Sequence, residues 1–406
     1  MKVLLVHNFY GSSAPSGENA VFEAEREMLL RRGVTVDVWT RHSDEIRGGR
    51  GEGGGRGLAR KLYGLVKGAV STVGNPFSAR ALARKIRAFQ PDVVHFHNTF
   101  PLVSPLAVRA AHRCGAKVVM TLHNYRLVCA AGVPTRCGAV CTDCFRAGKA
   151  SVWPAIRRRC YRGGLAATLP LALNIALYRR RWARWVDRFV ALSAFQRQVM
   201  IDAGFPAEKI AVKGNFVEAE ASPASPSVGR RGAVYVGRLS DEKGVKTLIE
   251  AWGGLSGDPL LKIIGDGDRR RDYERLARGR NIVFCGQQPH GVVLAELAAA
   301  KCLVMPSVCW ETFGLTVVEA ASAGTPSVVT DMGAFPDLVE RLGAGEVVRA
   351  GDAAALRAAL ARQLARPDSA EASARLRDNA AKAFSRESNF EQLTAIYRAA
   401  RLEEAR

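Results

Sequence analysis

The chain has 406 residues, of which 48% are hydrophobic and 24% charged, and its mean hydropathy is close to zero. These values indicate a soluble globular protein of two domains with roughly 200 residues each. The formal net charge is +21, and residues 1–220 hold 34 Lys and Arg against 15 Asp and Glu, a net +19. An acidic partner should therefore meet the first half. We expect an anionic membrane surface or a pyrophosphate-bearing lipid, since no aromatic-interleaved basic motif or zinc-finger spacing indicates nucleic acid.

The cellular compartment is inferred from the N-terminal sequence and the cysteines. Lys2 is followed by only four apolar residues before His7, so no signal peptide is recognisable. Nine cysteines without such a signal indicate a reducing cytoplasm. We therefore expect a cytoplasmic protein that is peripheral on the inner face of the cell membrane.

Strands and helices alternate from the first residues onward. An apolar strand at 3–6 precedes a loop at 16–18, a helix that Gly33 ends, and a second strand at 34–39. A Gly/Arg-rich loop follows at 47–57. This alternation implies a parallel sheet that is covered on both faces. The further strands expected in this half are at 93–97, 117–121 and 189–193.

The longest uncharged stretch is 163–178, which is shorter than the roughly 20 residues of a membrane span. Pro170 and Asn174 interrupt it. Because basic clusters precede it at 157–159 and follow it at 179–181, it could lie in a membrane interface. A buried helix with solvated ends is the alternative.

A second series of strands and helices follows a linker that is rich in Ala, Ser, Pro and Gly at 218–232. The sequence thus predicts an α/β protein of two doubly wound, Rossmann-like domains, at 1–217 and 233–385, with a central cleft between them. We expect the last helical segment, 386–406, to pack back on the first domain. The strands expected in the second domain are at 233–237, 260–264, 282–284, 303–305 and 327–330.

The segment 310–315 with Glu319 carries the clearest chemical pattern. It follows the apolar run 303–305, so we expect Glu311 in a strand-to-helix loop, Gly314 at the first helical turn and Glu319 inside the helix. A helix N-terminus offers N–H groups and a positive dipole end to a phosphate, and carboxylates accept hydrogen bonds from sugar hydroxyls. The pattern favours a site for a nucleotide-sugar diphosphate.

Two further loops of the second half suit a phosphate ligand. Gly237 and Arg238 end a strand, and Lys243 lies five residues beyond Arg238, so both cations can point into one pocket. Gly265 and Gly267 follow another strand and allow close backbone approach, although this spacing alone is weak.

In order and spacing, these motifs resemble the retaining glycosyltransferases of family 4 (glycosyl transferases group 1), which have the GT-B fold. The resemblance covers most of the chain and implies an acceptor-binding domain at 1–217 and a donor-binding domain at 233–385. It implies that Arg238 and Lys243 bind the diphosphate and that the backbone of Gly314 and Leu315 supports the distal phosphate. It also implies that Glu319 holds the ribose and that Glu311 faces the transferred sugar. The further donor-site residues that it implies are Gly237, Gly265 and Gly267.

The resemblance extends to the first half. The loop at 16–18 matches the small-residue loop that approaches the donor phosphate, which makes Gly17 a candidate. Many relatives have two glycines where this chain has one. The strand end at 121–126 resembles the family's His-bearing loop, and His123 would contact the transferred sugar. We expect His95 and His97, which share a strand, on opposite faces, with one of them lining the cleft.

Five cysteines lie within residues 129–160, and Cys141 and Cys144 have the spacing of metal ligands. Four of the five could bind a structural zinc ion, and buried or redox-labile thiols are the alternatives. The candidate ligands are Cys129, Cys141, Cys144 and Cys160.

The leading hypothesis is a metal-independent hexosyltransferase or related enzyme that moves a sugar, with retention, from a nucleotide diphosphate to an acceptor hydroxyl. Arg238, Lys243 and the helix end at Gly314 would stabilise the leaving diphosphate, so catalysis requires no cofactor. We expect the acceptor to be a lipid-linked saccharide of cell-surface polysaccharide or glycolipid synthesis. The alternatives are an inactive nucleotide-sugar binding protein and another GT-B enzyme, namely a phosphorylase or an epimerase.

Overall fold

The computed structural model describes residues 1–10, 17–47, 57–146, 151–217, 229–343 and 345–402. Most of the predicted loop at 47–57 and of the linker at 218–232 lies outside these residues, as does Ser16. The chain divides into two compact units. The first comprises Met1–Val133, Thr142–Lys213 and Phe390–Arg406, and the second comprises Pro134–Cys141 and Gly214–Asn389.

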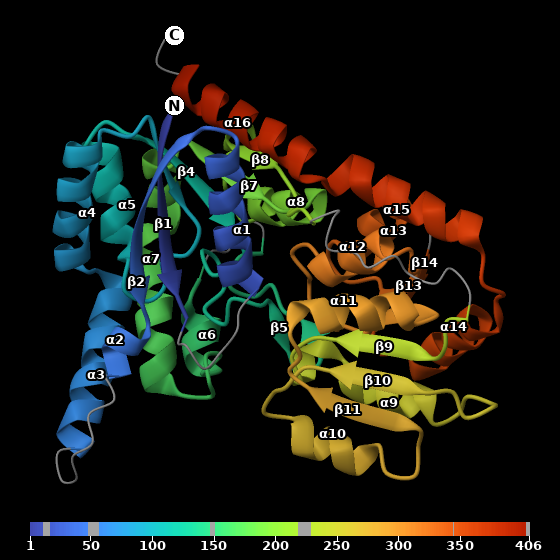
Figure 1. Cartoon of the computed structure of the whole chain (residues 1–406). Helices are drawn as coiled ribbons and strands as arrows, with labels where there is room; N and C mark the ends of the chain where they lie inside the picture. The colour runs from blue at the N-terminus through green and yellow to red at the C-terminus, as the bar shows by residue number, and fades with distance from the viewer. Residues whose placement is uncertain (11–16, 48–56, 147–150, 218–228, 344, 403–406) are drawn as a thin grey trace. The chain divides into compact units, whose positions relative to one another are not determined.

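The first unit contains a parallel sheet of six strands in the order β2-β1-β3-β4-β7-β8 (Figure 1). Its central strands read as continuous apolar runs, because helices cover both faces of a parallel sheet. In β1, residues 3–6 are fully buried. The strands are β1 (Lys2–Phe9), β2 (Thr35–His42), β3 (Val93–Phe96), β4 (Lys117–Leu122), β7 (Arg188–Ala191) and β8 (Ile210–Val212).

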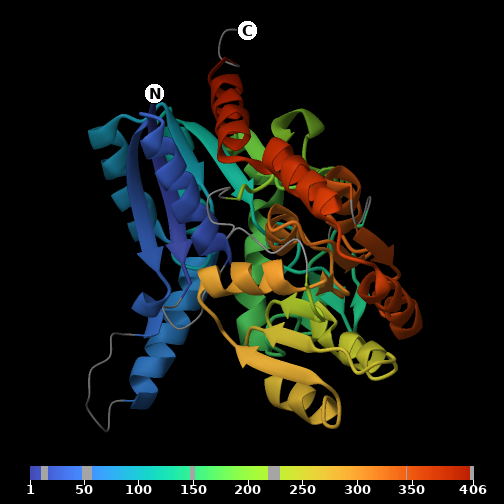
Figure 2. The same ribbon diagram turned by 45° about the vertical axis from the view of Figure 1, so that its right-hand side comes forward.

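Eight helices of the described residues follow these strands in the first unit, and Figure 2 shows them on either side of the sheet. Gly17 and Glu18 form the first turn of α1, whereas we expected them in the preceding loop. The helices are α1 (Gly17–Arg31), α2 (Asp44–Arg47), α3 (Gly57–Val73), α4 (Pro76–Phe89), α5 (Ser104–Arg113), α6 (Trp153–Arg157), α7 (Leu165–Trp185) and α8 (Ala194–Asp202).

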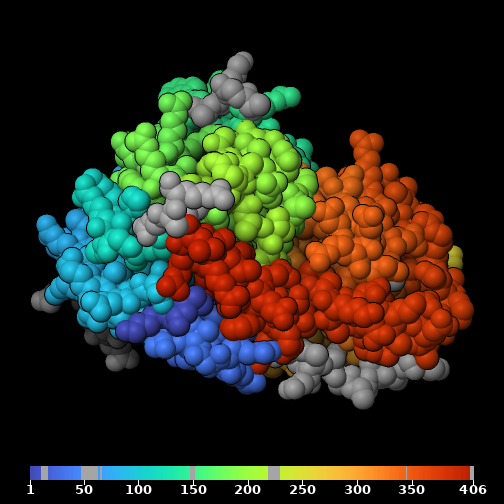
Figure 3. Space-filling model, turned by 90° about the horizontal axis from the view of Figure 1, so that it is seen from above, coloured from blue at the N-terminus to red at the C-terminus, as the bar shows by residue number. Residues whose placement is uncertain are grey.

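The C-terminal helix α16 (Arg386–Leu402) packs on the first unit from Phe390 onward. The Tyr397 hydroxyl is fully buried and lies 2.8 Å from His95 Nδ1. The Arg401 guanidinium lies 3.1 Å from the Asp92 carboxylate. In Figure 3 these last residues lie at the surface beside N-terminal residues of the same unit.

The second unit contains another parallel six-stranded sheet, in the order β11-β10-β9-β12-β13-β14. Five of its strands match the predicted positions to within a few residues, and the sixth, at Gly345–Val348, was not predicted. A short antiparallel hairpin, β5 (Thr135–Arg136) with β6 (Ala139–Val140), also belongs to this unit. The strands of the sheet are β9 (Ala233–Val236), β10 (Leu261–Ile264), β11 (Ile282–Gly286), β12 (Cys302–Met305), β13 (Ser327–Thr330) and β14 (Gly345–Val348). The helices are α9 (Val245–Trp252), α10 (Arg270–Leu276), α11 (His290–Ala299), α12 (Leu315–Ser322), α13 (Phe335–Leu342), α14 (Ala353–Ala365) and α15 (Ala370–Phe384).

Candidate functional site

The turn between β12 and α12 has the predicted form. Glu311 lies in the connecting loop, Gly314 is the N-cap of α12, and Glu319 lies in the second turn of the helix. Gly314 has φ 98°, and a Cβ atom there would lie 2.7 Å from the Phe335 ring. Only glycine therefore fits this position. No side chain caps α12 within the described chain, so its N-terminal N–H groups suit an anionic ligand.

A partly buried ion pair lies beside this turn. Lys243 Nζ donates to Glu311 Oε1 at 2.6 Å, and the Ser307 hydroxyl donates to the same oxygen at 2.5 Å. Burial alone would lower the pKa of Lys243, but the attraction of Glu311 outweighs it and the pKa is raised. Burial would raise the pKa of Glu311, yet Lys243 and Ser307 hold it below its ordinary value. Both groups are therefore charged at neutral pH.

Arg238 lies near this pair without touching it. Its guanidinium is 61% exposed and lies 3.0 Å from the Glu242 carboxylate. Its positive charge contributes to the lowered pKa of Glu311. The structure thus brings Lys243 and Glu311 into contact and leaves Arg238 at the surface beside them, where it remains able to meet a phosphate.

The predicted glycines pack two loops against each other. A Cβ atom on Gly265 would lie 2.0 Å from the Gly237 carbonyl oxygen, and one on Gly267 would lie 2.2 Å from the Leu239 carbonyl oxygen. These glycines thus have a packing role that does not depend on a ligand. The intervening Asp266 has Asp-x-Asp spacing with the next acid, but its carboxylate accepts from the Gly267 N–H and pairs with an arginine.

His290 is a site residue that sequence reasoning missed. It is the first residue of α11, and its Nε2 lies 2.9 Å from Glu319 Oε1. This hydrogen bond and the charge of Glu319 raise the pKa of His290. The sequence offered one signal for His290, which is its position directly after Pro289 at a helix start. Nothing local in the sequence connects His290 to Glu319.

The two candidate segments of the first unit meet at the carboxyl end of the first sheet. Asn124, next to His123, donates to Glu18 Oε1 at 2.8 Å, and Glu18 follows Gly17 in the first turn of α1. His123 Nε2 lies 3.0 Å from His97 Nδ1. Burial and the nearby His97 ring hold the pKa of His123 well below its ordinary value, so the imidazole is neutral at pH 7.

Behind His97 lies a buried charged cluster that was not predicted. Glu25 Oε1 lies 3.1 Å from His97 Nε2 and 3.2 Å from His95 Nδ1, and Glu25 Oε2 accepts from Lys213 Nζ at 3.0 Å. The expectation that His95 and His97 face opposite ways was wrong, because residues two apart in a strand share a face. Their ring centroids are 4.3 Å apart.

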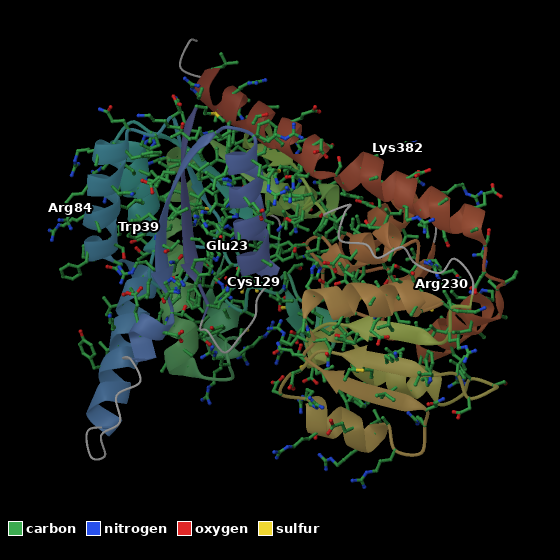
Figure 4. All side chains as sticks on the ribbon, in the orientation of Figure 1. Glu23, Trp39, Arg84, Cys129, Arg230 and Lys382 are labelled. Atoms are coloured by element: carbon green, nitrogen blue, oxygen red, sulfur yellow. The ribbon has the colours of Figure 1, made fainter. Side chains whose placement is uncertain are left out.

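The predicted zinc site is not supported. Within the described ranges, Glu25, His95 and His97 form the one group of three or more potential metal-ligand atoms within 4.8 Å of one another. Cys129 (Figure 4) instead donates to the Val133 carbonyl, and burial raises the pKa of its thiol to about 12. The four described cysteines Cys129, Cys141, Cys144 and Cys160 do not form such a group, although Cys144 and Cys160 lie near enough to contribute to the raised pKa of Cys129. A cation is equally disfavoured at Glu25, whose carboxylate already faces the Lys213 ammonium.

Comparison with known proteins gives the family. Residues 17–221 match Glycosyltransferase Family 4, and residues 219–383 match Glycosyl transferases group 1. The chain therefore belongs to glycosyltransferase family 4, a family of retaining glycosyltransferases, and its two parallel sheets have the GT-B fold.

Individual relatives show how far the likeness extends. The phosphatidyl-myo-inositol mannosyltransferase of Mycobacterium leprae is 31% identical over 45% of this chain and 50% of its own. The putative teichuronic acid biosynthesis glycosyltransferase of Bacillus subtilis is 24% identical over 83% of each chain. The crystal structure of Anabaena HepE in complex with UDP has a TM-score of 0.62 and 17% identity, over 97% of this chain and 99% of that one.

The likeness is partial for other relatives. The chain spans 50–64% of the lengths of that mannosyltransferase, of a 2-deoxystreptamine N-acetyl-D-glucosaminyltransferase from Streptomyces fradiae and of two glycogen synthases from Mycobacterium tuberculosis.

Proposed function

We propose that this protein transfers a hexosyl or related sugar, with retention, from a nucleotide diphosphate donor to an acceptor hydroxyl. The observation that carries the proposal is the charged Lys243–Glu311 pair beside the uncapped N-terminus of α12. The UDP bound in the related HepE structure supports a nucleotide ligand. Glu319, oriented by His290, would accept hydrogen bonds from the ribose hydroxyls.

The charges of this site suit the leaving group. As the glycosidic bond breaks, negative charge grows on the diphosphate, and Lys243, Arg238 and the N–H groups at Gly314 and Leu315 offer fixed positive potential. We therefore expect transfer without a divalent cation. The family resemblance supports a role for His123 in contact with the transferred sugar and for Gly17 in the loop that approaches the donor phosphate.

The donor is tested by thermal unfolding with UDP-, GDP-, ADP- and dTDP-sugars. We expect one nucleotide series to raise the melting temperature of the wild type and to lose most of this effect in Glu319→Ala. Glu340→Ala, at an exposed position of α13, is the matched control and should respond like the wild type. If no series stabilises the wild type, or if both variants respond equally, the proposed donor site is wrong.

We further propose that the first unit binds the face of an anionic membrane and acts on a lipid-linked saccharide. Four leucines at every fourth position of α7 are 40–48% exposed, and they lie between the basic clusters at 157–159 and 179–181. Other arginines, such as Arg84, point outward from α4 (Figure 4). No described helix is both long and apolar enough to cross a bilayer. The leucines are Leu165, Leu169, Leu173 and Leu177.

Vesicle flotation tests the membrane surface. Anionic vesicles should retain the wild type at low salt and release it at high salt, whereas a variant with Leu169→Glu and Leu173→Glu should bind at least tenfold less. Leu402→Glu, at an apolar position of α16 that is more exposed than Leu169 and Leu173, is the control. Equal partition of the wild type to neutral and anionic vesicles would exclude the proposal.

A further inference from the structure

A small cavity lies within the first unit at the carboxyl ends of β3 and β4. Its volume is about 50 Å³, and none of its 15 lining residues is acidic. Since one water needs roughly 10–15 Å³ measured in this way, the cavity has room for three or four waters, or for a group of about that many oxygen atoms. His97, His123, Arg126 and Trp182 are among the lining residues.

Two residues that line the cavity carry hydrogen-bond donors that no protein acceptor satisfies. Arg126 Nε and Nη1 are buried and have no partner, and the same is true of the Trp182 indole Nε1, in the part of the protein that the structure describes. A buried donor without a partner costs about 1–3 kcal/mol, so these three donors need acceptors, which bound water or a ligand would supply.

The Arg126 guanidinium is also held in place and uncompensated. Its central carbon lies 4.5 Å from the Phe100 ring centroid and 5.6 Å from that of Tyr161. Among the described residues it forms no ion pair. An arginine whose guanidinium packs beside two aromatic rings presents its planar set of donors with little loss of side-chain entropy, which suits the oxygens of a phosphate or carboxylate.

We propose that this cavity binds an anionic group of the acceptor, a phosphate or a carboxylate, through Arg126 and the Trp182 indole. This inference rests on the proposed transferase function and names the acceptor class. Because His123 lines the same cavity, an acceptor anchored there lies beside the residue to which that function assigns the transferred sugar. The anion is either the phosphate of a lipid-linked saccharide or the carboxylate of an acidic sugar.

Binding measurements by calorimetry test the site without any reaction. The probes are inorganic phosphate and glucuronate, with glucose as the neutral control. We expect at least one anion to bind the wild type, and Arg126→Gln to weaken that binding at least tenfold. Arg162→Gln is the matched control, since Arg162 stacks at 5.2 Å on the same Tyr161 ring but does not line the cavity. Trp182→Phe, which keeps an aromatic ring and removes one donor, should weaken binding about threefold.

Two comparisons separate this site from the donor site. Lys243→Met should leave anion binding at Arg126 unchanged and abolish stabilisation by nucleotide sugars. Arg126→Gln should weaken anion binding and leave stabilisation by nucleotide sugars unchanged. Anion binding that Lys243→Met removes and Arg126→Gln does not would overturn the inference while leaving the proposed function intact. Equal binding of glucose and both anions, or no binding of either anion, would also overturn it.

Transfer assays then identify the source of the anion. Acceptors are compared in matched pairs, a prenyl diphosphate-linked saccharide against its uncharged alkyl glycoside, and a uronic acid acceptor against the corresponding hexose. Arg126→Gln should raise KM at least tenfold for the charged member of one pair and change kcat little. Equal effects on both members of each pair would assign Arg126 a purely structural role and refute the inference.

Discussion

Removal of the Glu25 carboxylate gives the sharpest test of how the first unit is stabilised. Glu25 Oε2 lies 3.0 Å from Lys213 Nζ, and both side chains are at most 2% exposed. Breaking a buried pair by removing one partner costs about 3–5 kcal/mol, because the other charge is left buried without compensation. We therefore expect Glu25→Gln to lower the free energy of unfolding of the first unit by about that amount.

Hydrogen exchange resolved by segment is the suitable assay, because the chain has two units and a single melting temperature would mix them. Protection should fall in β1 and β3 of Glu25→Gln and stay unchanged in β12. Lys213→Met added to Glu25→Gln should recover about 2 kcal/mol or more. Glu27→Gln, on the exposed face of the same helix, should change stability by less than about 0.5 kcal/mol.

The pH dependence of the same pair gives an independent check. Burial would raise the pKa of Glu25, but Lys213, His97 and His95 hold it well below its ordinary value. A carboxylate with a lowered pKa stabilises the folded state above its unfolded pKa, and this contribution is lost as the pH falls.

One outcome of the mutant measurements would refute the assignment of a stabilising buried pair. It is that Glu25→Gln and Lys213→Met have additive effects, each below about 1 kcal/mol at pH 7.

Three further predictions concern other parts of the chain. Lys243→Met leaves the partly buried Glu311 carboxylate without its cation and removes a positive charge from the proposed donor site. We therefore expect kcat for sugar transfer to fall roughly 10²- to 10³-fold, and an unchanged kcat would contradict this role. Gly244→Ala should destabilise the second unit by more than 2 kcal/mol in urea unfolding, because Gly244 has φ 69° and its Cβ would lie 1.9 Å from a carbonyl oxygen. Gly257→Ala is the control. Gly257 has φ 80° but its Cβ would meet no atom within 4 Å, so this substitution should cost about 1 kcal/mol. Burial lowers the pKa of His95 to about 4, so the unfolded chain binds a proton that the folded chain does not, and stability should fall by up to about 3 kcal/mol as the pH drops from 6.5 to 4. His95→Gln should flatten that dependence of the urea midpoint, and an unchanged slope would contradict the assignment.

The parts of the structure that depend on nearby residues were predictable from the sequence. Parallel strands buried on both faces appear as short apolar runs, so β12 and β13 could be placed to within a residue. Glu311, Gly314 and Glu319 belong to one turn and one helix, and their relation follows from local geometry alone. The donor half of the candidate site was therefore readable as a pattern.

Contacts between distant residues were not predictable. Glu25 and Lys213 are 188 positions apart, and no periodicity connects them. The same holds for His290 with Glu319, which meet only because α11 and α12 come together in the fold. For the cysteines the sequence suggested a contact that the structure does not support. Their short intervals in sequence predicted a set of zinc ligands, and their sulfur atoms do not form such a set.

The division of the first unit between two distant segments has a consequence for synthesis on the ribosome. Tyr397, which is buried against His95, belongs to a segment that leaves the exit tunnel after the second unit. The N-terminal sheet can form early, yet the hydroxyl partner of His95 arrives only after the whole second unit has been translated. The first unit therefore begins to form before the second unit and is completed after it, and nascent chains that stop before residue 390 should expose that incomplete surface to chaperones and proteases.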